Sequence, residues 1–305
     1  MPGPNYKNYN YNKMNYKNLL IKALLWGFFL FLSFCNPSVQ NNKESLLLLL
    51  LNNQNISNNN NQSLCEINFS LQNTSLFNKI IEAPGATYSG FKDPNKAING
   101  ICGAGKTSGS TDVYSLQSSS NSTYCKQNEK CLVLEIENKK ILDGPGIDIV
   151  VFENPFCYGG ENNCNNARFM EPVILEVSYD GNNWCGWNPQ YIGSDTSLTN
   201  LRKPMNWQRF AGIEPVLFNQ KNWQYSENDI FDPSKAGGDG FDLGDSNFGQ
   251  SGEGCNSTIK NQILTNGFIY LRLTSAVSRG FIYDSSSFDQ TADIDGVIAR
   301  YITNR

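Results

Sequence analysis

The sequence predicts an all-β domain, built as a two-sheet sandwich or jelly roll with long loops clipped by disulfides. Two observations predict this class. Short apolar segments with the spacing of β-strands recur from residue 132 onward, separated by turns rich in glycine and asparagine. Eight cysteines occur from residue 65 onward, an even set that is typical of a disulfide framework in an exported protein. Several short strands joined by long loops favour a sandwich architecture.

Residues 1–34 have the parts of a signal peptide. Lysines precede an apolar run that is too short to span a bilayer. Cys35 follows this run directly, at the position where a bacterial lipoprotein is cleaved and acylated. The end of the run resembles a lipobox, although Phe34 stands where a small residue is usual. We expect a lipid anchor at Cys35, with a plain cleaved signal peptide as the alternative, and Met1 or Met14 as the start.

Residues 35–64 are expected to form a tether. The stretch at 52–62 is almost entirely Asn, Gln and Ser, and buries too little apolar surface to offset the entropy of ordering. The leucine run at 46–51 is too short to cross a membrane and is expected to form a short helix on the membrane or on the domain. The folded domain is expected to cover residues 65–305.

The strands of this domain are predicted from apolar patterns and from the turns between them. Five segments read as strands: 132–137, 147–152, 173–179, 268–273 and 296–302. The clearest turn sequences are DGPG at 143–146 and DGNN at 180–183. No helical period is sustained after the tether.

Composition excludes several classes of function. The net charge is −4 and the chain has no cluster of Lys and Arg in its folded part, so we expect no nucleic-acid partner. The chain contains no histidine. Catalysis by a Ser-His-Asp or Cys-His arrangement and metal binding through imidazole are therefore excluded.

Seven short segments carry a resemblance to a known family. They occur in this order: DPNKA at 93–97, DGPGIDIVVFEN at 143–154, EVSYDGNNW at 176–184, FAGIEPV at 210–216, GGDGFDL at 237–243, IYLRL at 269–273 and DIDGV at 293–297. The chain thereby resembles a group of exported bacterial β-sandwich proteins, including leptospiral lipoproteins and cell-surface proteins with sorting tails. The resemblance spans about residues 80–302. It implies surface display and a jelly roll similar to galactose-binding-like domains, and it implies no catalytic residue.

The cysteines downstream of the tether are expected to form structural disulfides: Cys65, Cys102, Cys125, Cys131, Cys157, Cys164, Cys185 and Cys255. Two pairs, Cys125 with Cys131 and Cys157 with Cys164, are close enough in sequence to clip loops at strand ends. Many other pairings are possible with eight cysteines. The absence of Cys-x-x-Cys and of histidine argues against a zinc site.

The acidic, glycine-rich stretch at 237–245 is the best ligand candidate. Asp239, Asp242 and Asp245 lie in a loop with the oxygen-rich character that Ca²⁺ prefers, although the spacing is not that of an EF-hand. Further acids would add ligands if the fold brings them close: Asp148, Glu153, Asp293 and Asp295. The alternative is that these residues shape turns and bond their own backbone. Both interpretations stay open.

Two other patterns have a functional and a structural interpretation. Seven aromatic residues would suit a sugar-stacking platform or ordinary packing: Trp184, Trp187, Trp207, Trp223, Tyr158, Tyr191 and Tyr225. The sequence GICGAGKT at 100–107 spells a P-loop, but no apolar strand precedes it and a poor helix start follows. We expect a loop there, and no bound nucleotide.

These observations predict a surface-exposed lipoprotein of the outer membrane that acts as a binding or adhesion module. A structural calcium ion is one of the two interpretations left open for its acidic stretch, and its loops are expected to present a surface to a host protein or a glycan. We do not expect an enzyme. The alternatives are a glycan hydrolase with paired carboxylates in a cleft, and a purely structural envelope protein.

Overall fold

The computed structural model describes residues 66–283 and 291–305. These residues belong to one compact unit, 62–305. The predicted signal peptide, Cys35, the tether and Cys65 lie outside the described residues. Within the described ranges, no helix is long and apolar enough to cross a membrane.

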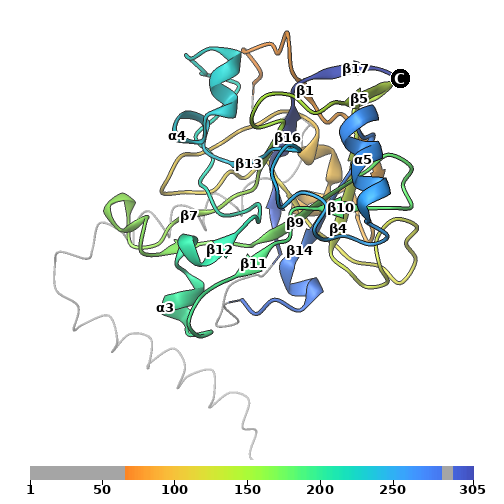
Figure 1. The fold of residues 1–305 in the computed structure, drawn as a ribbon. Helices are drawn as coiled ribbons and strands as arrows, with labels where there is room; N and C mark the ends of the chain where they lie inside the picture. The colour runs from red at the N-terminus through yellow and green to blue at the C-terminus, as the bar shows by residue number, and fades with distance from the viewer. Residues whose placement is uncertain (1–65, 284–290) are drawn as a thin grey trace, which may run out of the picture. The chain divides into compact units, whose positions relative to one another are not determined.

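The chain folds mostly into β-strands, arranged in several antiparallel sheets with few helices (Figure 1). The larger sheet has five strands in the order β10 (Cys185–Gly186), β9 (Val173–Ser178), β14 (Tyr270–Ser275), β4 (Cys131–Glu135) and β2 (Lys79–Glu82). A second sheet has four strands in the order β1 (Ser75–Leu76), β16 (Gly296–Ala299), β6 (Ile149–Phe152) and β13 (Asp239–Phe241). The predicted all-β class is confirmed.

Four two-stranded pairs extend this framework at its edges. They join β11 (Gln190–Tyr191) to β12 (Trp207–Gln208), β15 (Asp293–Ile294) to β3 (Tyr114–Ser115), β17 (Ile302–Asn304) to β5 (Lys139–Ile141), and β7 (Phe156–Cys157) to β8 (Arg168–Phe169). Each of the five predicted strand segments overlaps at least one observed strand.

One core contains inward side chains from both larger sheets. In the five-stranded sheet Leu271 of β14 lies opposite Leu134 of β4 and Val177 of β9, and all three are buried in this core. Val151 of β6 and Val297 of β16 belong to the same core. Alternate residues of a strand point to opposite faces, which explains why the apolar period of the sequence located these strands.

The segment IVVF of β6 is apolar throughout because both of its faces are buried. Val151 faces the core just described, whereas Val150 and Phe152 pack in a second cluster with Phe218 and Ile298. A strand that is covered on both sides shows a continuous apolar run.

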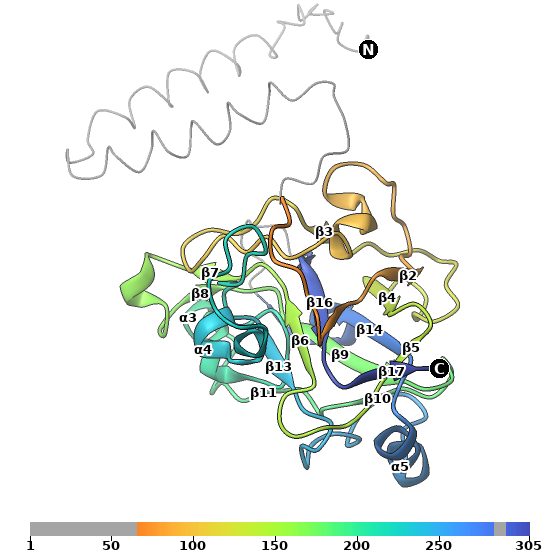
Figure 2. The same ribbon diagram turned by 90° about the horizontal axis from the view of Figure 1, so that it is seen from above.

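The helices are short. The α-helices are α3 (Leu198–Leu201), α4 (Pro233–Ala236) and α5 (Ser257–Asn266), and the 3₁₀ helices are η2 (Gly90–Lys92), η3 (Pro94–Ala97), η4 (Glu161–Asn163), η5 (Pro204–Asn206), η6 (Glu227–Phe231) and η7 (Ala276–Arg279). Figure 2 shows α3 and α4 on the β13 side of the domain, with α5 on the other side near β10. The β13 side therefore combines a sheet edge with loops and short helices.

Helix α5 differs from the sequence expectation that no helix follows the tether. Its amides at Thr258 and Ile259 donate to the side chain of Asn256, which forms the N-cap. Ile263 is its one fully buried residue, and Ile259 and Leu264 pack partly buried against the same core. This apolar face has three residues within fewer than two turns, which is too short to be recognised as a sustained helical period.

The three described disulfides include both pairs favoured by sequence spacing, Cys125–Cys131 and Cys157–Cys164. The third, Cys185–Cys255, joins β10 to the segment before α5 across 70 residues of sequence. Cys102 is also disulfide-bonded. The segment 100–107 that spells a P-loop is a loop with no helix after it, as predicted.

Candidate functional site

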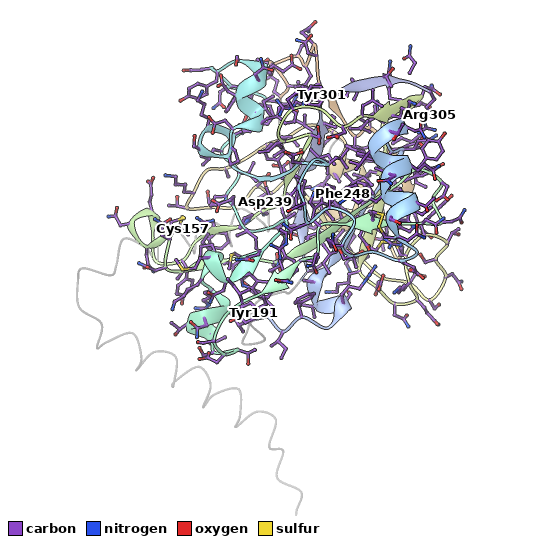
Figure 3. The ribbon with its side chains drawn as sticks, in the orientation of Figure 1. Cys157, Tyr191, Asp239, Phe248, Tyr301 and Arg305 are labelled. Atoms are coloured by element: carbon purple, nitrogen blue, oxygen red, sulfur yellow. A yellow bond between two sulfur atoms is a disulfide. The ribbon has the colours of Figure 1, made fainter. Side chains whose placement is uncertain are left out.

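A cleft of about 700 Å³ lies beside β13, and we call it the β13 cleft. One wall contains Asp239 of β13 together with Asp242 and Asp245, which follow the strand. The facing wall is formed by residues 204–214, which run from η5 into the FAGIEPV segment. Figure 3 labels Asp239, and in that view it lies between Cys157 and Phe248. The fold therefore brings three acids singled out from the sequence to one cleft.

Asp239 holds the two walls together. Its Oδ2 accepts hydrogen bonds from the amides of Ile213 at 3.0 Å and Glu214 at 3.4 Å. Burial, together with the charge of Glu214, raises the pKa of Asp239 to about 7, although these amides oppose the shift. Asp239 thus joins the acidic stretch at 237–245 to the segment at 210–216.

Two arginines and a glutamate add charge to the cleft. Arg168 forms a 2.7 Å ion pair with Glu214 and donates to the carbonyl oxygen of Ile213. Arg209 donates from Nε to the carbonyl oxygen of Asn188 at 2.8 Å. The amide of Asn247 lowers the pKa of Asp245, and the charge of Arg209 adds to this shift. Arg209 has a φ of 62°, a conformation that costs energy for a residue with a side chain.

Asp242 connects the cleft to a second group of acids. Asp143, Asp148 and Asp242 each place a carboxylate oxygen within 4.8 Å of the others. Asp148 is buried, and its two oxygens accept from the amides of Gly144 at 3.0 Å and Leu243 at 2.7 Å. This group ties the DGPG turn to the strand end at 241–243. In the described ranges it is the one set of three or more acids or cysteines close enough to share a cation.

The pKa values of these acids reflect their crowding. Burial raises the pKa of Asp148 to about 7, and the charges of Asp143 and Asp242 add to the shift. Partial burial and the charge of Asp242 also raise the pKa of Asp143. Either protons or a cation would relieve this repulsion.

The other predicted metal ligands, Glu153, Asp293 and Asp295, do not line the cleft. Glu153 accepts from the amide of Asp293 at 2.9 Å through Oε1. Asp295 is buried and accepts from the amide of Cys102 through both oxygens at 3.0 Å. Burial raises the pKa of Glu153 and of Asp295 well above the ordinary range. These three acids do not join Asp239, Asp242 or Asp245 in one cation-sized group.

Gly212 shows how tightly the loop at 210–216 is built around Glu153. The buried Oε2 of Glu153 accepts no hydrogen bond from the described residues. A Cβ at Gly212 would lie 3.2 Å from this oxygen and 2.6 Å from the carbonyl oxygen of Glu171, and its φ is +79°. Glycine is therefore required at this position of the loop.

The aromatic residues do not form an open platform. Trp184, Trp187 and Trp207 are between 2% and 4% exposed. Trp187 and Trp207 line the β13 cleft, but their indole N–H groups already have acceptors. Nε1 of Trp187 donates to the carbonyl oxygen of Asp242, and Nε1 of Trp207 donates to the carbonyl oxygen of Leu201. The remaining four aromatics do not line this cleft: Tyr158, Tyr191, Trp223 and Tyr225.

Sequence reasoning missed part of the site. Asp143 lies in the DGPG turn, five residues before Asp148. This short spacing between two aspartates could have indicated the group that they form with Asp242. Arg168, Arg209 and Met205 also line the cleft. No local pattern marks them, because their segments meet β13 only in the folded chain.

Comparison of this chain with known protein families, with curated proteins and with solved structures found no match.

Proposed function

We propose that this protein is a lipid-anchored binding module on the surface of a bacterial cell, with the β13 cleft as its ligand site. The observation that carries the proposal is the cleft itself. A concave site of about 700 Å³ combines carboxylates, guanidinium groups and apolar side chains, and ligand sites commonly have this volume and mixture. The leader sequence, the disulfides and the resemblance to exported β-sandwich proteins support the location.

We propose further that the two larger sheets are the layers of a jelly-roll β-sandwich. Both sheets are antiparallel, and their inward side chains share one core, as the layers of a sandwich do. The resemblance to galactose-binding-like domains supports this topology.

The test is a binding screen with the full-length protein against arrays of glycans and of host proteins. Asp239→Asn and Asp245→Asn are screened in parallel, with Glu137→Gln as a control that removes one charge from an exposed residue outside the cleft. The proposal expects a ligand whose signal falls in the two cleft variants and persists in the control. A screen without any ligand would instead favour a purely structural envelope protein.

Membrane attachment is tested separately through Cys35. The wild-type protein is expected to partition into the detergent phase of Triton X-114, and Cys35→Ser is expected to remain in the aqueous phase. Partitioning that is the same for both proteins would contradict a lipid anchor at this cysteine.

A second candidate function is a glycan hydrolase that uses carboxylates. The observation that favours it is Asp239, whose pKa of about 7 suits a general acid, in a cleft shared with Asp242 and Asp245. New reducing ends from a glycan that the array identifies, lost in Asp239→Asn, would establish this function. Binding without any product would favour the binding module.

A further inference from the structure

We propose that the β13 cleft binds a lysine or arginine side chain of a partner protein. The inference rests on the proposed function, because it names the chemistry of the ligand for that cleft. Charge, hydrogen-bonding capacity and the shape of the apolar wall each support a cation that carries an aliphatic stem.

The charge of the cleft favours a cation. Four carboxylates and two guanidinium groups line it. Arg168 and Glu214 neutralise one another in their 2.7 Å ion pair. Of the three carboxylates on the β13 wall, Asp239 is only partly ionised near pH 7, because its pKa is raised to about 7. The carboxylates of Asp242 and Asp245 therefore supply the negative charge in a cleft that also contains the guanidinium group of Arg209. The carboxylate of Asp143 lies in one group with Asp242 and increases the negative potential there.

Two carboxylate oxygens on this wall are available to a donor. Asp242 accepts the amide of Gly244 at 2.7 Å through Oδ1, and Asp245 accepts the amide of Asn247 at 2.7 Å through Oδ1. In the described part of the chain, no hydrogen bond reaches Oδ2 of either residue. An ammonium or guanidinium group offers only donors, and a charge-assisted hydrogen bond to a carboxylate is among the stronger ones in proteins.

The cleft suits a sugar less well. A pyranose ring usually stacks on an exposed aromatic face, but Trp187 and Trp207 are 2% and 4% exposed. The indole N–H groups of both residues already donate to backbone carbonyl oxygens. The hydroxyl groups of a sugar also need donors in return, and the cleft has more acceptors than donors to offer.

The facing wall suits the methylene groups of a long basic side chain. Met205 is 63% exposed at the cleft, next to Pro204, and Phe210 lies deeper in the same wall. Lysine and arginine side chains pack their stems on apolar surface while the charged end stays in a polar environment. A flexible methionine adapts to such a stem.

The experiment is isothermal titration of the full-length protein with a short peptide that alternates lysine and glycine. The comparison peptide has the same sequence with every lysine acetylated, and EDTA is present so that no divalent cation competes. Asp242→Asn and Asp245→Asn keep an oxygen for the amides of Gly244 and Asn247. Glu137→Gln again removes one exposed charge outside the cleft. Each variant must first have the same melting temperature as the wild type, so that a loss of binding does not reflect a loss of folding.

The proposal expects the lysine peptide to bind, and the acetylated peptide to bind at least about 10-fold more weakly. Asp242→Asn and Asp245→Asn should each weaken binding by about 10-fold, and Glu137→Gln should not. Equal binding of the two peptides, equal effects of the three substitutions, or no binding would overturn the proposal. If a glycan from the array depends on the cleft acids while the lysine peptide does not bind, the inference falls and the proposed function stands.

Discussion

Asp148 illustrates how single acids organise this domain. The residue is buried and accepts the amides of Gly144 and Leu243, which lie in two different segments. Asp239 likewise accepts a backbone amide from the loop at 212–214, and Asp295 accepts the amide of Cys102. The acids that suggested a metal site therefore also bind the backbone. The interpretation that these acids bond the backbone therefore describes part of their chemistry, and the calcium site stays a prediction.

Replacing Asp148 by alanine is expected to destabilise the domain by about 2 to 4 kcal/mol, because the buried amide of Leu243 and the half-buried amide of Gly144 lose their acceptor. Asp148→Asn keeps one acceptor oxygen and should lose less. The measurement is urea unfolding at pH 5, where Asp148 is mostly protonated in the folded protein. Equal stability of Asp148→Ala and wild type would contradict this role.

Stability is expected to be greatest at about pH 4 and to fall on both sides of that pH. Asp148 and Asp239 have pKa values of about 7 in the folded protein, against 3.8 for an unperturbed aspartate. The folded state then holds protons that the unfolded chain has released, so stability falls as pH rises from about 4 through 7. Asp195 and Asp229, with pKa values lowered to about 2, lose their contribution as pH falls below about 4.

Thermal unfolding from pH 3 to pH 9 measures this dependence. Asp239→Asn should flatten the alkaline side of the curve, because it removes one of the buried acids whose pKa is raised in the folded protein. A stability that rises steadily from pH 5 to pH 8 would contradict the account.

At the scale of elements, the sequence predicted the strands whose apolar residues alternate or form a continuous buried run. The strands β4, β6, β9, β14 and β16 have apolar patterns that follow from their two faces. Helix α5 was missed because its apolar face has only Ile259, Ile263 and Leu264, and the other seven of its ten residues are polar. The wall at 204–214 was missed because its short elements are held by contacts with β13 and with Arg168, which no local pattern indicates.

The disulfides predict a graded loss of stability. In the loop-entropy view, a bond that closes a longer loop restricts the unfolded chain more. Cys185–Cys255 spans 70 residues and Cys125–Cys131 spans 6. Replacing both cysteines of the longer pair by serine should cost about 2 kcal/mol more than doing so for the shorter pair. Urea unfolding of the two paired variants measures the difference, and a reversed order would contradict it.

At the scale of the whole molecule, calcium dependence remains a prediction from the sequence. Asp143, Asp148 and Asp242 lie close enough together to share a cation, so they are the residues at which calcium binding is tested. If calcium binds only the folded protein, the melting temperature in millimolar Ca²⁺ should exceed that in EDTA. Asp242→Asn should reduce this difference and Glu137→Gln should keep it. Melting curves that coincide in Ca²⁺ and EDTA would contradict the prediction that calcium stabilises the folded protein.

The central claim is that the β13 cleft binds a basic side chain of a partner. Hydrogen–deuterium exchange of the full-length protein, with and without the lysine–glycine peptide, tests it most directly. The account predicts slower exchange in the two walls, residues 204–214 and 239–245, and little change elsewhere. Protection confined to other segments, or an exchange pattern that the peptide leaves unchanged, would contradict it.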